Sequence, residues 1–142
     1  MASELKCHKE VSQFMEFQFG ENFKYDENLV IESVLGTNLL MVIDKTPGIN
    51  PPRYFLFPEK NGHEICLVLF APLANEVVFS KSLINGIPLS ITTRSGGQGS
   101  DDLKVLYKWS VAKNIYAPAV CTLRPRLHIK ASSCEKILST FH

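Results

Sequence analysis

The sequence predicts an all-β, mainly antiparallel fold: a sandwich or barrel of about nine short strands with a short C-terminal helix. Two Asn-Gly dipeptides, Asn61-Gly62 and Asn85-Gly86, each separate two apolar runs and supply the positive φ angles of a type I′ hairpin turn. Several stretches alternate apolar and polar residues, which is typical of strands with one buried face. The 142 residues suit a single hydrophobic core, so one β-rich domain, 1–142, is expected.

The first third of the chain is predicted to form three strands before a rigid loop. The alternating segment 11–19 is expected to be the first strand, after a flexible segment 1–10 and before a polar connection at 20–27. The next two strands are expected at 29–35 and 39–43, joined by a turn at Gly36-Thr37-Asn38. Segment 46–52 is predicted to be a stiff loop, because its prolines fix φ and remove backbone donors.

The remaining strands are predicted on either side of the Asn-Gly turns and of a glycine-rich loop at 95–100. The predicted strands are 53–57, 64–70, 76–83, 87–93, 103–111 and 123–130. Pro88 cannot donate a ladder hydrogen bond, so the strand that contains it is expected at a sheet edge. Segment 131–142 is predicted to be the helix, since Ser132 and Glu135 have the spacing of a capping box.

The composition argues against several broad classes. A net charge of +1 gives no global reason to expect binding to nucleic acid or to an anionic membrane. No signal segment is visible, and the longest apolar run, about ten residues, is half of a membrane-spanning helix. No transmembrane segment is therefore expected.

The four cysteines, Cys7, Cys66, Cys121 and Cys134, are widely spaced and include no Cys-x-x-Cys pair. Without a visible signal segment, reduced thiols are expected, and Cys66 is expected to be a small core residue. The expected location is intracellular (cytoplasm or nucleus), or a virion if the protein is viral.

A basic stripe is the first candidate site. Arg124, Arg126, His128 and Lys130 alternate with apolar residues, so on a strand they share one face. Such a face can neutralise phosphates of RNA or anionic lipid, or an acidic protein patch. Lys104 and Lys108 would extend this face if their strand is adjacent. The alternative is an ordinary solvated face.

A PPxY sequence, Pro51-Pro52-Arg53-Tyr54, is the second candidate site. Two prolines favour an extended polyproline conformation, and grooves of WW domains bind the prolines and the tyrosine. The alternative is a stiff loop in which Tyr54 is the first core residue of the following strand.

On this motif the chain resembles the small matrix proteins of non-segmented negative-strand RNA viruses. Their PPxY sequence usually lies in an N-terminal arm, whereas Pro51–Tyr54 lies between predicted strands. The resemblance implies contact with acidic lipid and nucleocapsid and recruitment of WW-domain ubiquitin ligases.

No motif indicates a catalytic centre, a cofactor or a metal. Gly96-Gly97-Gln98 matches a tripeptide of peptide-release factors, but acidic residues follow it, so a hairpin loop is the better interpretation.

A non-enzymatic structural or interaction protein is the leading hypothesis, and exposed strand edges make a homo-oligomer a further expectation. Two alternatives stay open. One is a β barrel that binds a small ligand, or nucleic acid on the stripe with Tyr107 and Trp109; the other is an enzyme with a Cys–His pair.

Overall fold

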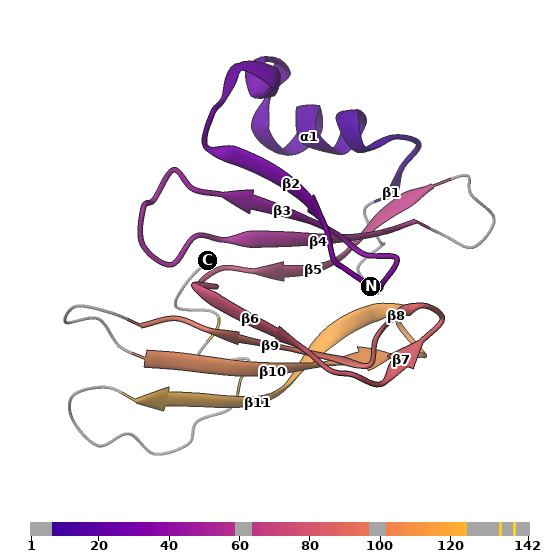
Figure 1. The fold of residues 1–142 in the computed structure, drawn as a ribbon, viewed down its shortest axis with the longest axis vertical. Helices are drawn as coiled ribbons and strands as arrows, with labels where there is room; N and C mark the ends of the chain where they lie inside the picture. The colour runs from indigo at the N-terminus through magenta and orange to yellow at the C-terminus, as the bar shows by residue number, and fades with distance from the viewer. Residues whose placement is uncertain (1–6, 59–63, 97–101, 125–133, 135–137, 139–142) are drawn as a thin grey trace.

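The computed structural model describes residues 7–58, 64–96 and 102–124, together with Cys134 and Leu138. It has three layers: helix α1 lies on a five-stranded sheet, and that sheet packs on a four-stranded sheet (Figure 1). The sheets are not closed into a barrel, so the predicted all-β fold is confirmed in its sandwich form.

The five-stranded sheet has the order β1-β5-β4-β3-β2, and every neighbouring pair is antiparallel. Its strands are β1 (Cys7–His8), β2 (Leu29–Ser33), β3 (Leu40–Asp44), β4 (Arg53–Pro58) and β5 (Ile65–Ala71). The predicted hairpin between β2 and β3 is confirmed, with Gly36 at φ +77° in the turn. The β4–β5 pairing is also confirmed, whereas Asn61-Gly62 lies outside the described residues.

The four-stranded sheet has the order β11-β10-β9-β6 and is also antiparallel. Its strands are β6 (Glu76–Phe79), β9 (Ser90–Arg94), β10 (Asp102–Ser110) and β11 (Ile115–Arg124). A two-stranded ribbon of β7 (Leu83–Ile84) and β8 (Ile87–Pro88) interrupts the β6–β9 hairpin. Asn85 and Gly86 both have positive φ, +53° and +81°, as the type I′ prediction requires.

Segment 11–19 is a helix, α1 (Val11–Phe19), and the predicted strand there is wrong. Apolar residues at 11, 14, 15 and 19 also fit the i, i+3, i+4 spacing of a helix face. Phe14 and Met15 are both 1% exposed and pack on the outer face of the five-stranded sheet. The side chain of Gln13 accepts the backbone N–H of Lys9 at 2.9 Å, which stabilises the helix start.

A short 3₁₀ helix, η1 (Glu21–Tyr25), follows α1 where a polar connection was predicted. The part of segment 1–10 that the structure describes is ordered by pairing, since β1 is hydrogen-bonded to β5. Flexibility was expected there, and residue 7 is instead fixed to the sheet.

The two faces of the five-stranded sheet bury different residues. Met41, Ile43 and Phe55 face the other sheet, whereas Val42 and Leu56 face α1. Both faces are thus covered by apolar residues, which explains why β3 and β4 read as continuous apolar runs.

Strand β10 keeps the predicted alternation. Leu103, Val105 and Tyr107 are at most 2% exposed and face the core, whereas Lys104 and Lys108 are exposed. The four-stranded sheet therefore has one core face and one solvent face.

The strand predicted at 87–93 is divided in two: β8, which contains Pro88, pairs with β7 alone and so is an edge strand as predicted, whereas β9 is not. Strand β8 ends at Pro88. Strand β9 begins two residues later and lies between β6 and β10 in the four-stranded sheet. The Pro88 carbonyl accepts the hydroxyl of buried Tyr116 at 2.5 Å, so the proline fixes the ribbon to the core.

Strand β11 was missed over most of its length, because Pro118 and an interrupted alternation conceal it. Leu106 pairs with Val120 and Tyr107 with Pro118, so Ala119 is the extra residue of a β-bulge. Of the predicted strand 123–130 only residues 123 and 124 are described, as the end of β11. Of the predicted helix 131–142 only Cys134 and Leu138 are described, and both are helical.

All four cysteines form disulfides, and the expectation of reduced thiols is wrong for this structure. Cys7 is bonded to Cys66, and Cys121 is bonded to Cys134. The first bond joins β1 to β5, and the second joins β11 to the C-terminal segment. Cys66 is 2% exposed, as a core residue should be. Spacing along the chain could not show these pairs, since the partners are 59 and 13 residues apart.

Candidate interaction surface

A row of polar side chains crosses the outer face of the four-stranded sheet. Glu76 pairs with Arg94, Arg94 with Lys104, and Lys104 with Thr122, each on the neighbouring strand. All four residues are exposed. We call this face, with Lys108 further along β10, the basic sheet face.

Arg94 and Asp102 form an ion pair at one end of this face, with 2.9 Å between Nη2 and Oδ2. The Arg94 Nε also donates to Asp102 Oδ1 at 3.2 Å, which makes the pair bidentate. The hydrogen bonds and charge of Asp102 raise the pKa of Arg94. One of the cations is therefore already matched by an anion.

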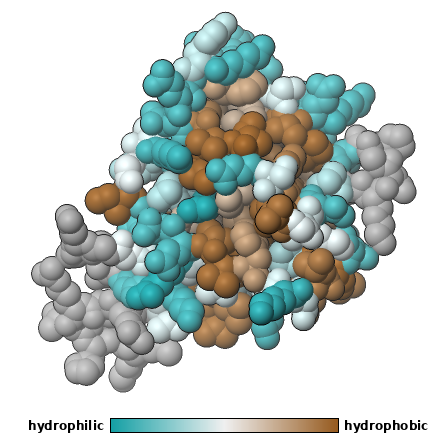
Figure 2. Space-filling model, in the orientation of Figure 1, coloured by the Kyte–Doolittle hydropathy of each residue, from teal (hydrophilic) through white to brown (hydrophobic). Residues whose placement is uncertain are grey.

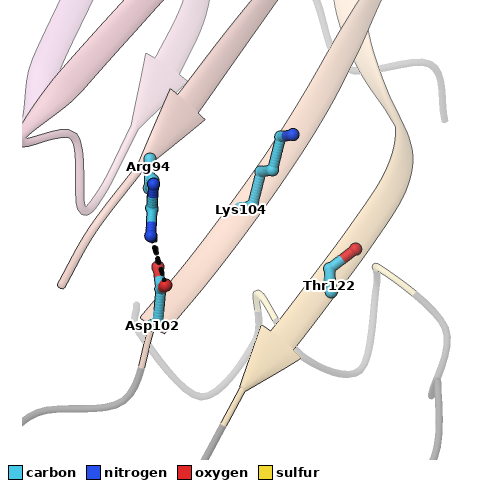
Figure 3. A pocket seen from close by; sticks show the side chains of 4 residues that line it. All are labelled: Arg94, Asp102, Lys104 and Thr122. Carbon is cyan, nitrogen blue, oxygen red and sulfur yellow. Dashed lines mark hydrogen bonds and ion pairs between the residues drawn. The ribbon is translucent and has the colours of Figure 1, made fainter.

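Arg94, Asp102, Lys104 and Thr122 line a shallow hollow of about 230 Å³ (Figure 3). The Lys104 amine points away from the ion pair, and the Thr122 hydroxyl lies across the hollow on β11. Among the described residues, neither Lys104 nor Lys108 forms an ion pair. Ammonium and hydroxyl donors around an open hollow suit a carboxylate or another oxyanion.

An apolar row lies directly beside the charged one. Val78 pairs with Thr92, Thr92 with Leu106, and Leu106 with Val120. Val78 is 64% exposed and Val120 is 54% exposed. Figure 2 shows apolar side chains among polar ones at the lower margin of the molecule, which is the layer of this sheet. Such a mixture of exposed apolar and cationic side chains is typical of a protein contact surface.

The predicted anionic-partner residues divide into two groups. Lys104 and Lys108 share the outer face of β10, and β10 is the neighbour of β11, as the sequence required for them to extend the stripe. Arg124 ends β11 at the register position opposite Asp102. Arg126, His128 and Lys130 lie outside the described residues.

Tyr54 of the PPxY sequence is a core residue. It is 8% exposed and lies among the rings of Phe14, Phe19 and Phe70, with centroids 4.9–5.9 Å away. Gln18 of α1 donates to its hydroxyl at 3.5 Å. In this conformation the tyrosine is covered by α1, and a WW-domain groove could bind it only after the helix moves.

The rest of the motif also has structural contacts. The Pro51 carbonyl accepts the N–H of Ala74 at 3.2 Å, and the Pro52 carbonyl accepts that of Asp44 at 3.1 Å. Arg53 donates from Nε to the Ala74 carbonyl at 2.7 Å. The alternative interpretation, a stiff loop leading into a core strand, describes this arrangement.

The aromatic pair suggested for nucleic-acid stacking does not lie on the basic sheet face. Tyr107 is 2% exposed on the core side of β10. Trp109 is also packed against the core, with its ring 5.1 Å from Tyr116 and 6.1 Å from Phe57. The placement of these two residues beside the basic stripe was therefore wrong. They alternate with Lys104 and Lys108 along β10, so they point to the opposite face of the sheet.

One group of metal-ligating residues comes together that the sequence did not indicate. Ligand atoms of Cys7, Glu64 and Cys66 all lie within 4.8 Å of one another. Both sulfurs are joined in the disulfide, and metal binding by cysteine requires thiolates. The Cys–His enzyme alternative requires Cys66 or Cys121 beside a histidine, and both of these cysteines are disulfide-bonded.

No family model, no curated protein and no solved structure matches this chain. Among the described residues, none of the helices has the length and apolar character needed to cross a bilayer.

The surface residues that sequence reasoning missed are Glu76, Arg94 and Thr122. They lie on three different strands, and only strand pairing brings them together. Of these three residues, only Arg94 had a signal in the local sequence, because it directly follows the alternating run that predicts a strand at 87–93.

Proposed function

We propose that this chain is a non-enzymatic interaction protein that binds an acidic protein surface through its basic sheet face. The observation that carries the proposal is the exposed row containing Lys104, beside the apolar row of Val78 and Val120. The outer face of the five-stranded sheet is covered by α1, whereas no described helix or strand covers the outer face of the four-stranded sheet.

An acidic protein suits this face better than nucleic acid does. Single-stranded nucleic acid is bound by cationic grooves in which exposed aromatic rings stack on the bases. The row of paired residues between those of Lys104 and Lys108 instead exposes the aliphatic side chains Val78 and Val120, and an apolar centre with a polar rim is typical of protein interfaces.

Retention on immobilised poly-L-glutamate tests the proposal. We expect the parent chain to be retained at low salt and released as salt screens the contact. Lys104→Glu/Lys108→Glu should abolish retention, because it replaces both cations that have no described ion-pair partner.

The matched control is Lys9→Glu/Lys45→Glu, which changes the net charge equally but lies outside the four-stranded sheet. It should keep most of the retention. Equal losses in both variants would mean that net charge alone acts, and the proposal would fail. Tighter, sequence-independent retention on single-stranded RNA than on poly-L-glutamate would favour nucleic acid instead.

A viral matrix-like or accessory role is the more specific form of this proposal, and the basic sheet face is what supports it. Cosedimentation with vesicles containing about a third anionic lipid tests the lipid contact expected of such a role. A WW-domain partner belongs to the same form and requires α1 to uncover Tyr54.

An intracellular or virion location is likewise part of the proposal. The two disulfides set a condition on it, because cytosolic thiols are normally kept reduced. Counting the free thiols of protein isolated from its native setting tests this condition.

A further inference from the structure

The opposite end of the sandwich carries the opposite charge. Helix α1, η1 and the turn into β2 expose four carboxylates that we call the acidic cap. These are Glu16, Glu21, Asp26 and Glu27. Residues 7–33 contain six carboxylates and two lysines, a net charge of −4, whereas the whole chain carries +1. The polar surface of this layer forms the upper margin of Figure 2.

The acidic cap also has exposed apolar groups. Phe17 is 65% exposed and Tyr25 is 81% exposed, and both lie beside the carboxylates on α1 and η1. Large aromatic side chains on the surface are the residue type that most often anchors protein interfaces. The cap therefore matches the basic sheet face in both respects: carboxylates for its lysines, and rings for its aliphatic row.

These two surfaces lie on opposite outer layers of one molecule (Figure 1). A contact between them cannot form within a chain, but it can form between copies. Each added copy leaves one basic sheet face and one acidic cap uncovered, which is the geometry of a head-to-tail assembly. A net charge near zero also removes the global repulsion that keeps strongly charged proteins apart.

We infer that the acidic partner of the basic sheet face is the acidic cap of a second copy of this chain, and that copies associate head to tail. This inference rests on the proposed function, since it names the partner of the same face. The junction pairs Lys104 and Lys108 with carboxylates of the cap.

Sedimentation velocity at several protein concentrations tests the inference. At about 20 mM salt the weight-average sedimentation coefficient of the parent should rise with concentration, and at about 0.5 M salt it should return to the monomer value. Lys104→Glu/Lys108→Glu and the cap variant Glu16→Lys/Glu21→Lys/Asp26→Lys/Glu27→Lys should each be monomeric at both salt concentrations. The control Lys9→Glu/Lys45→Glu should still associate.

Combining the two sets in one chain gives the decisive variant. Its sheet face is acidic and its cap is basic, so the complementarity is restored and association should return. Because neither set alone associates, recovery in the combined variant excludes misfolding as the cause of the losses.

A parent chain that stays monomeric at low salt would overturn the inference, and so would a combined variant that does not recover. The two proposals fail separately. A monomeric parent that is still retained on poly-L-glutamate contradicts self-association alone, whereas retention that survives Lys104→Glu/Lys108→Glu contradicts the proposed function.

Discussion

Tyr107 and Tyr116 place their phenol groups in the apolar interior. Burial raises the pKa of Tyr107 to about 12, and a hydrogen bond with Thr93 opposes this in part. Burial also raises the pKa of Tyr116. An unfolded chain loses these protons near pH 10. The contribution of these two phenols to stability is therefore fully present below about pH 10 and is lost as the pH rises toward 12, because the unfolded state ionises first.

We predict that Tyr107→Phe loses less stability than the parent between about pH 9 and pH 12. The free energy of unfolding that the variant loses over this range should be smaller than the parent's loss by about 2 kcal/mol. This is the free energy that corresponds to raising the pKa of one phenol to about 12. Urea unfolding at a series of pH values measures it. Identical pH profiles for Tyr107→Phe and the parent would contradict this account.

At the scale of elements, helix α1 controls access to the PPxY sequence. Tyr54 is covered by Phe14, Phe19 and Gln18, all from the helix. We predict that an isolated WW domain binds a peptide of residues 47–58 but binds the folded chain at least tenfold more weakly. Fluorescence anisotropy with the labelled WW domain measures both affinities.

The same peptide carrying Tyr54→Ala is the control and should not bind. Equal affinity for the folded chain and the parent peptide would show that α1 does not cover the motif in solution. Mutating Tyr54 in the intact protein is less informative, since removal of a buried aromatic ring costs about 3–5 kcal/mol of stability.

The sequence predicted the elements whose signal is local. Asn85-Gly86 and the alternation through Leu103, Val105 and Tyr107 depend on turn chemistry and on one strand face, and both are present. Segment 11–19 was misassigned because a pattern of nine residues fits a strand and a helix alike, and only packing on Val42 and Leu56 decides. Strand β11 was missed because Pro118 and the bulge at Ala119 interrupt its alternation.

The candidate surface was predictable only in its β10 half. Lys104 and Lys108 have the right parity within one strand, so their shared face follows from the sequence. Their neighbours Arg94 and Thr122 depend on pairing with β9 and β11. No local pattern encodes the order of strands in a sheet, and the opposition of basic sheet face and acidic cap follows from that order.

At the scale of the whole molecule, two disulfides tie both described ends of the chain to the sandwich. The Cys7–Cys66 and Cys121–Cys134 bonds close loops of different length, with sequence separations of 59 and 13 residues. The loop-entropy model gives about 4 kcal/mol for the longer loop and about 3 kcal/mol for the shorter.

We predict that alkylation of the unfolded, unreduced protein labels no cysteine, and that reduction lowers the midpoint of urea unfolding. Cys7→Ser/Cys66→Ser should lower the midpoint more than Cys121→Ser/Cys134→Ser does, because its loop is longer. Intact mass after alkylation counts the thiols. Four labelled cysteines before reduction would contradict both bonds.

The basic sheet face is where we propose that this chain meets its partner. An amide chemical-shift titration with poly-L-glutamate, at low salt and at a protein concentration where the chain is monomeric, tests it residue by residue. We expect the largest shifts on β9, β10 and β11, around Arg94, Lys104 and Thr122, and no shifts on α1 and η1. Shifts that are absent from these strands, or centred on α1, would contradict it.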